Sequence, residues 1–274
     1  ARLITDIMWY RQLGFESVVW SQLGTRVGLW VAYVAVLAVV SYISATLAIR
    51  ARPDFADGST IRFHGDTIEV GKSVSSRSAR RIAVVCSIVV GLIFGSQFNM
   101  NWSEILLMFN GQSFGTTDPI FGLDTGFYVF VLPGLQLLLT ALNIMLVVGL
   151  IFSIVTHIAM GGIRFTMPVH GNGLFAMTPR GRRQIAIWLL LAMLSWAASQ
   201  VVGVFNTLTQ SGSRITGATY TTTHATIPVM FIMAGVTAVV GILLAVWIMR
   251  SKALSANAGT QYASAGAAWR AWRV

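Results

Sequence analysis

Five long stretches without a charged side chain constrain this chain more than any other feature of its sequence. They cover residues 27–49, 82–98, 134–156, 184–205 and 227–249. A 23-residue helix rises about 35 Å, which exceeds the roughly 30 Å hydrocarbon core of a bilayer. Hydrophobic residues make up 55% of the chain and charged residues only 10%, which argues against a soluble enzyme or a disordered chain. The sequence therefore predicts an all-α, polytopic transmembrane helix bundle.

Two amphipathic segments flank these stretches. Residues 4–23 mix Trp9, Tyr10, Phe15 and Trp20 with charged side chains, and residues 102–109 repeat the pattern on a smaller scale. Such segments suit helices in the lipid headgroup region, but helices packed on the spans would look the same. Both interpretations stay open.

The longest polar segment, residues 51–81, also permits two readings. Apolar residues alternate around residues 64–66, so a short hairpin or a plain loop is expected there.

Positive charges alternate along the chain. Of the 19 Lys and Arg residues, 15 fall in residues 50–81, 157–183 and 250–274, and four fall in residues 1–26, 99–126 and 206–226. Basic loops remain cytoplasmic, so the first group is predicted to be cytoplasmic and the second extracytoplasmic. The net charge of +10 is then a topology signal and a contact for anionic lipids, with no nucleic-acid partner expected.

The two ends of the chain suggest a piece of a larger protein. An extracytoplasmic start at Ala1 would need an earlier span, and the basic, aromatic residues 267–274 resemble the approach to a later one. We therefore expect one further span on each side.

Residues 114–133 read Phe-Gly-x-x-Asp-Pro-x-Phe-Gly-x-Asp-x-x-Phe-Tyr-x-Phe-x-Leu-Pro. This block resembles the signature of uncharacterised protein family 0182, multi-pass membrane proteins of actinobacteria and cyanobacteria. Weaker similarities occur in the same order at residues 9–18, 52–53, 161–164 and 216–221.

The resemblance implies about seven N-terminal spans followed by a large extracytoplasmic domain, with this chain supplying spans two to six. It implies a bacterial plasma-membrane protein, and it implies no activity.

The block also contains the candidate site residues. They are Asp118, Pro119, Asp124, Phe127, Tyr128 and Pro133, read as a polar and structural motif. Asp118 and Asp124 could bind a cation or a lipid headgroup. The structural alternative is that Asp118-Pro119 starts a turn and that Asp124 caps the short helix or turn before Phe127. The third span is expected to begin after Pro133.

Other candidates for chemistry are weaker. Residues 111–115 fit the G-x-S-x-G pattern, and Ser113 could form a triad with one of the two aspartates and His224. However, no strand is predicted before the serine. The spacings of His64, His157 and His170 match no metal motif, so we expect no metal and no cofactor. Cys86 is expected to be a small core residue, and Gly91, Gly95, Gly235 and Gly241 are expected at close helix contacts.

The spans contain no acidic or basic side chain, and their main polar candidates are Asn143 and Gln200. Ion-coupled carriers usually hold a charge at depth. We therefore expect no enzyme but a scaffold or assembly subunit that anchors its own extracytoplasmic domain, with membrane lipids and other envelope proteins as partners. The alternative is a transporter, channel or lipid-handling protein, which a lipid-sized cavity or a path lined by Asn143, Gln200 or His157 would favour.

Overall fold

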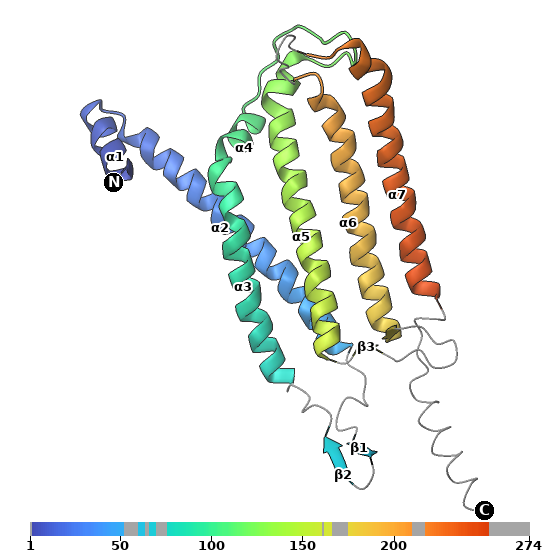
Figure 1. Ribbon diagram of the computed structural model, residues 1–274. Helices are drawn as coiled ribbons and strands as arrows, with labels where there is room; N and C mark the ends of the chain where they lie inside the picture. Colours follow the sequence, from blue (N-terminus) through green and yellow to red (C-terminus); the bar gives the residue numbers. More distant parts are fainter. Residues whose placement is uncertain are drawn as a thin grey trace, which may run out of the picture. The chain divides into compact units, whose positions relative to one another are not determined.

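A computed structural model describes residues 2–51, 60–63, 66–69, 76–160, 162–165, 175–209 and 217–251 (Figure 1). Its long helices are α2 (Glu16–Arg50), α3 (Ser76–Met100), α5 (Leu132–Ala159), α6 (Pro179–Asn206) and α7 (Ile227–Arg250). Among the described residues, five helical segments are long and apolar enough to cross a membrane, and each contains one predicted stretch or most of it. The all-α membrane helix bundle is confirmed, and its helices extend beyond most of the predicted stretches.

The amphipathic N-terminal segment is not one helix. The short α1 (Arg2–Gln12) ends at a break, and Gly14 adopts a φ of 75°, which glycine tolerates because it has no Cβ. Glu16 then begins α2, which continues without interruption into the first apolar stretch. The predicted segment 4–23 is therefore divided between α1 and the start of α2.

The prediction that a helix begins after Pro133 is wrong, because a π-helical turn, η2 (Phe127–Val131), precedes α5. The same arrangement recurs where η3 (Thr222–Thr226) precedes α7 and Pro228. A proline ring clashes with the carbonyl four residues earlier in a regular α-helix. For both prolines, the residue four positions earlier lies inside the π turn. The wider turn avoids this clash, so the helix can begin ahead of the proline.

Two small antiparallel hairpins lie in the connections. β1 (Thr60–Phe63) pairs with β2 (Asp66–Glu69), so the hairpin alternative for this segment is confirmed. A second hairpin, β3 (Ile163–Phe165) with β4 (Phe175–Met177), was not predicted. The segment 102–109 forms α4 (Trp102–Phe109), which contacts η2.

The contacts divide the chain into two compact units. One comprises Ala1–Tyr42, Val84–Met145 and Ser195–Gly235, and the other comprises Ile43–Ala83, Leu146–Leu194 and Val236–Val274. Each long helix contributes residues to both units. The described parts of the predicted extracytoplasmic segments lie in the first unit, and those of the predicted cytoplasmic segments lie in the second.

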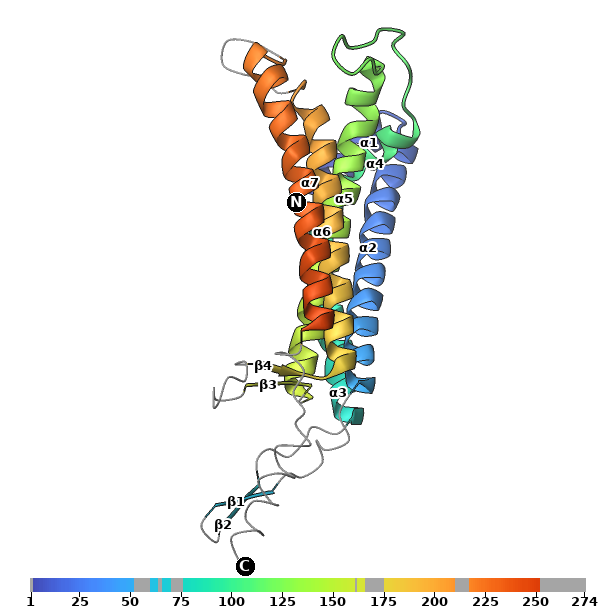
Figure 2. The same ribbon diagram turned by 90° about the vertical axis from the view of Figure 1, so that its right-hand side faces the viewer.

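Within each unit, α5 and α6 lie side by side (Figure 1, Figure 2). In the first unit, Asn143 Nδ2 donates to Ser199 Oγ at 2.7 Å. In the second unit, a Cβ at Gly149 would lie only 2.6 Å from the Trp188 ring, so the absence of a side chain lets the two helices approach.

The predicted glycine contacts are confirmed at three of four positions. A Cβ at Gly91 would lie 3.0 Å from Val34 O, and one at Gly95 would lie 2.8 Å from Trp30 Nε1. A Cβ at Gly241 would lie 2.5 Å from Met193 Cβ, whereas one at Gly235 would meet nothing within 4 Å.

Candidate functional site

The loop between α4 and η2 is folded around its two aspartates. Gly115 and Gly122 turn the chain with φ of 70° and 67°, and Thr117 and Asp124 form a short antiparallel bridge. The backbone hydrogen bond from Asp118 N to Leu123 O, at 2.9 Å, closes the tip of the loop. The candidate residues are therefore held in a defined turn.

The Asp118 carboxylate is surrounded by donors. Its Oδ1 accepts from Ile120 N at 2.8 Å and Phe121 N at 2.7 Å, and its Oδ2 accepts from Leu123 N at 3.0 Å and Tyr128 Oη at 2.7 Å. Desolvation by itself raises the pKa of Asp118, but these hydrogen bonds outweigh it and lower the pKa below its usual value. Asp118 therefore ties the tip of the loop to the first turn of the following helix.

Asp124 holds the other side of the loop. Its Oδ2 accepts from Ser113 Oγ at 2.5 Å and Gly115 N at 3.0 Å, and its Oδ1 accepts from Phe114 N at 3.1 Å and Gly126 N at 2.6 Å. The Ser113 hydrogen bond is the largest cause that lowers the pKa of Asp124 to about 2. Because Gly126 lies in the first helical turn, Asp124 occupies the position of a helix cap.

The proposed triad geometry is not formed by the described contacts. Ser113 donates its hydroxyl hydrogen to Asp124, and its oxygen accepts from Gly115 N at 3.2 Å. The His224 ring nitrogen Nδ1 instead lies 2.8 Å from Thr223 Oγ1 and 3.1 Å from Tyr220 O. In this arrangement the serine and the carboxylates stabilise the turn, and Ser113 has no imidazole partner among the described residues.

The remaining motif residues link the loop to the helices. Tyr128 is buried and joined to Asp118, while Phe127 lies in η2 with its ring centroid 5.7 Å from that of Phe205 on α6. Phe121 also packs on Phe205, at 4.9 Å. Pro119 is exposed in the turn, and Pro133 lies in the first turn of α5.

A buried polar network occupies the second unit, and only one of its members was a candidate. His157 is fully buried, and its Nε2 lies 3.1 Å from Gln184 Oε1. Gln184 Nε2 donates to Ser44 O at 2.8 Å, and Ser44 Oγ donates to Gly149 O at 2.6 Å. The network ties α2, α5 and α6 together within this unit.

The other candidates lie elsewhere. His64 and His170 lie outside the described residues. Cys86 is exposed on α3, so its prediction as a core residue is wrong, because none of the described helices covers that position. Within the described segments, no group of three or more His, Cys, Asp or Glu side chains could hold a metal ion.

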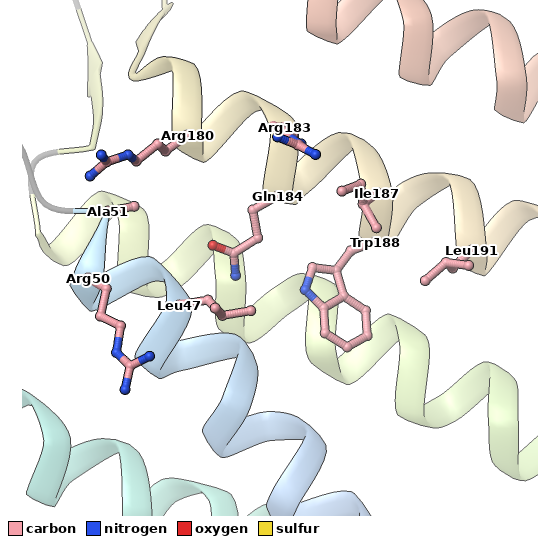
Figure 3. A pocket seen from close by; sticks show the side chains of 9 residues that line it. All are labelled: Leu47, Arg50, Ala51, Arg180, Arg183, Gln184, Ile187, Trp188 and Leu191. Atoms are coloured by element: carbon pink, nitrogen blue, oxygen red, sulfur yellow. The ribbon is translucent and has the colours of Figure 1, made fainter.

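A cavity of about 500 Å³ opens beside the network (Figure 3). Arg50 from α2 and Arg180 and Arg183 from α6 line it together with Gln184, and its apolar wall includes Ile187 and Leu191. This cavity was not predicted. The lining residues from Arg180 to Leu191 recur every three to four residues, so the sequence alone could have placed them on one face of a helix. The contribution of α2 to the cavity was not visible in the sequence.

Comparisons with known proteins agree with the resemblance in the sequence. The chain is 67% identical over its full length to a UPF0182 protein of Bifidobacterium adolescentis and 65% identical to one of Bifidobacterium longum. It is 31% identical over 88% of its length to a UPF0182 protein of Corynebacterium diphtheriae. The chain spans about a quarter of the length of these relatives. No solved structure matches it.

The sequence profile described as "Uncharacterised protein family (UPF0182)" matches residues 1–271, almost the whole chain. Together with five helices able to span a membrane, this match shows that the chain belongs to the UPF0182 family.

Proposed function

We propose that this chain is the multi-pass part of a bacterial plasma-membrane protein and acts as a non-enzymatic scaffold that anchors an extracytoplasmic domain. The observation that carries the proposal is that the helices of this chain bury little of one another's apolar surface. In the most apolar window of each span, only 17% to 39% of the residues are buried by the rest of the described chain. Lipids or other protein spans must cover the remaining apolar surface.

The helix α7 supplies the clearest uncovered surface. Its window is 17% buried, and Ile232 and Leu243 are 63% and 62% exposed. We propose that this face packs on other membrane proteins of the envelope.

A photo-crosslinking amino acid at Leu243 in the full-length protein tests the assembly role. Under the proposal, Leu243 gives adducts with one defined membrane protein, and the matched control position Ala245, which is 1% exposed, gives none. Adducts confined to lipid and to the protein's own chain, both at Leu243 and at Ile232, would remove the support for a scaffold.

The charge distribution supports the proposed orientation, and the grouping of the loops into two contact units is consistent with it. In a Cys86→Ala background, the exposed positions Gln112 and Pro179 can be replaced by cysteine one at a time. We expect an impermeant maleimide to label Gln112→Cys in intact cells and Pro179→Cys only after permeabilisation. Equal labelling of both in intact cells contradicts the orientation.

The non-enzymatic part of the proposal is supported by the loop hydrogen bonds, in which Ser113 and Asp124 engage each other. A serine-directed probe should give the same labelling of wild type and Ser113→Ala. Specific labelling that Ser113→Ala abolishes would favour a hydrolase.

Lipid handling is the second candidate, and the cavity beside Gln184 favours it. Reconstitution with a fluorescent lipid distinguishes the two functions. A scaffold leaves the rate of lipid movement between leaflets at the level of empty vesicles, whereas a lipid-handling protein raises it.

A further inference from the structure

The cavity in the second unit combines two kinds of surface. Its rim contains the guanidinium groups of Arg50, Arg180 and Arg183, and its wall continues along α6 through Ile187 and Leu191 (Figure 3). From Arg183 to Leu191 the helix rises about 12 Å. A ligand that satisfies both surfaces must therefore carry an anionic group and an apolar part.

Among the described residues, no acidic side chain pairs with the positively charged rim. Residues 146–194 and 236–274 contain no Asp or Glu, and the acidic residues of the second unit all lie in residues 54–69. Within the described part of the chain, no ion pair or hydrogen bond involves the side chains of Arg50, Arg180 and Arg183, and all three residues are exposed. Arg182 differs, because its Nη1 donates to Ser251 O at 2.7 Å.

The wall consists of exposed apolar side chains, which suits a surface that contacts lipid. Leu47, Ile187 and Leu191 expose 46%, 44% and 44% of their surface within the chain. Gln184 lies between rim and wall, and its contacts with His157 and Ser44 hold its side chain in place. Among the described residues, Gln184 donates only one of its two amide hydrogens, to Ser44 O, which leaves the second for a ligand.

We infer that this cavity binds one anionic glycerophospholipid, with the phosphate at the arginine rim and an acyl chain along Ile187 and Leu191. A basic pocket at the cytoplasmic ends of spans is suited to such headgroups. In Figure 3 the three guanidinium groups point in different directions, so the bound phosphate draws at least two of them towards it. A soluble phosphate would match the rim but leave the apolar wall unused.

The inference rests on the membrane placement in the proposed function, and its test uses the full-length protein in lipid nanodiscs. Phosphatidylglycerol and phosphatidylcholine with identical chains are compared by native mass spectrometry, with inorganic phosphate as a competitor. We expect one retained phosphatidylglycerol, little retained phosphatidylcholine, and no displacement by phosphate. Equal retention of both lipids overturns the anionic site, and displacement by phosphate assigns it to a soluble anion.

Paired substitutions test the residues. Arg180→Gln with Arg183→Gln should weaken phosphatidylglycerol binding roughly 30-fold. The matched control, Arg77→Gln with Arg80→Gln, removes the same charge from exposed positions of the same unit that do not line the cavity, and it should change binding less than threefold or so. Equal losses in both pairs would show a general charge effect and contradict a built site.

A measurement on the wild type covers the case in which the double variant fails to fold. Phosphatidylglycerol with a photoreactive acyl chain should label the peptide that contains Ile187 and Leu191. Adducts on other spans without any on this peptide overturn the inference. The maleimide experiment on Gln112→Cys and Pro179→Cys reports membrane placement separately, so a failure there is distinguishable from a failure to bind lipid.

Discussion

Replacing Asp118 by asparagine tests whether this carboxylate holds the loop on the following helix. An asparagine oxygen placed at the Oδ1 position keeps the hydrogen bonds from Ile120 and Phe121. The amide nitrogen at the Oδ2 position cannot accept from Leu123 N or from the hydroxyl of Tyr128, so those two hydrogen bonds are lost.

The expected cost is about 2 kcal/mol for opening of the loop. This is less than the roughly 3–6 kcal/mol of two hydrogen bonds to a buried charged group, because water reaches this half-exposed site. That cost corresponds to roughly 30-fold faster amide exchange of Leu123. Tyr128→Phe removes only one of the two hydrogen bonds and should accelerate exchange roughly five- to tenfold.

Hydrogen exchange of the full-length protein in nanodiscs, read on the peptide around Leu123, measures both changes. Peptides from α6 provide the internal control and should exchange at the wild-type rate in both variants. Unchanged exchange of Leu123 in Asp118→Asn, together with wild-type rates in α6, would refute the role of this carboxylate in the loop.

Two further predictions concern the same loop and the helix contacts. The pKa of Asp124 is about 2, below the ordinary 3.8, so its stabilisation of the loop is present above about pH 4 and is lost as the pH falls through about 2. The rate of amide hydrogen exchange at Gly126, corrected for the intrinsic rate, should rise only in that window. A rise centred near pH 4 would contradict the depressed pKa. Gly241→Ala places a Cβ 2.5 Å from Met193 Cβ and should destabilise the protein by about 1–3 kcal/mol. The control, Gly235→Ala on the same helix, meets nothing within 4 Å and should be neutral or slightly stabilising in thermal unfolding. Equal melting temperatures for the two variants would exclude the close contact.

The spans were predictable because they depend on a local property. A helix without charged side chains and long enough for the bilayer core is recognised from its own residues, and the family block at residues 114–133 is likewise contiguous. The capping alternative for Asp124 followed from its place ahead of a helix. Its oxygens accept from Gly126 and from residues 113–115, and that second set of partners depends on how the loop returns on itself.

The sequence by itself determined which segments are helical and apolar, and which connections carry the positive charge. Only the tertiary structure decided that Cys86 faces outwards, that π turns accommodate the prolines, and that Arg50 shares a cavity with Arg180. The physical reason is the distance along the chain over which each interaction acts. Hydrophobic transfer and helix hydrogen bonding act within a segment, whereas exposure and cavities depend on contacts between residues more than a hundred positions apart.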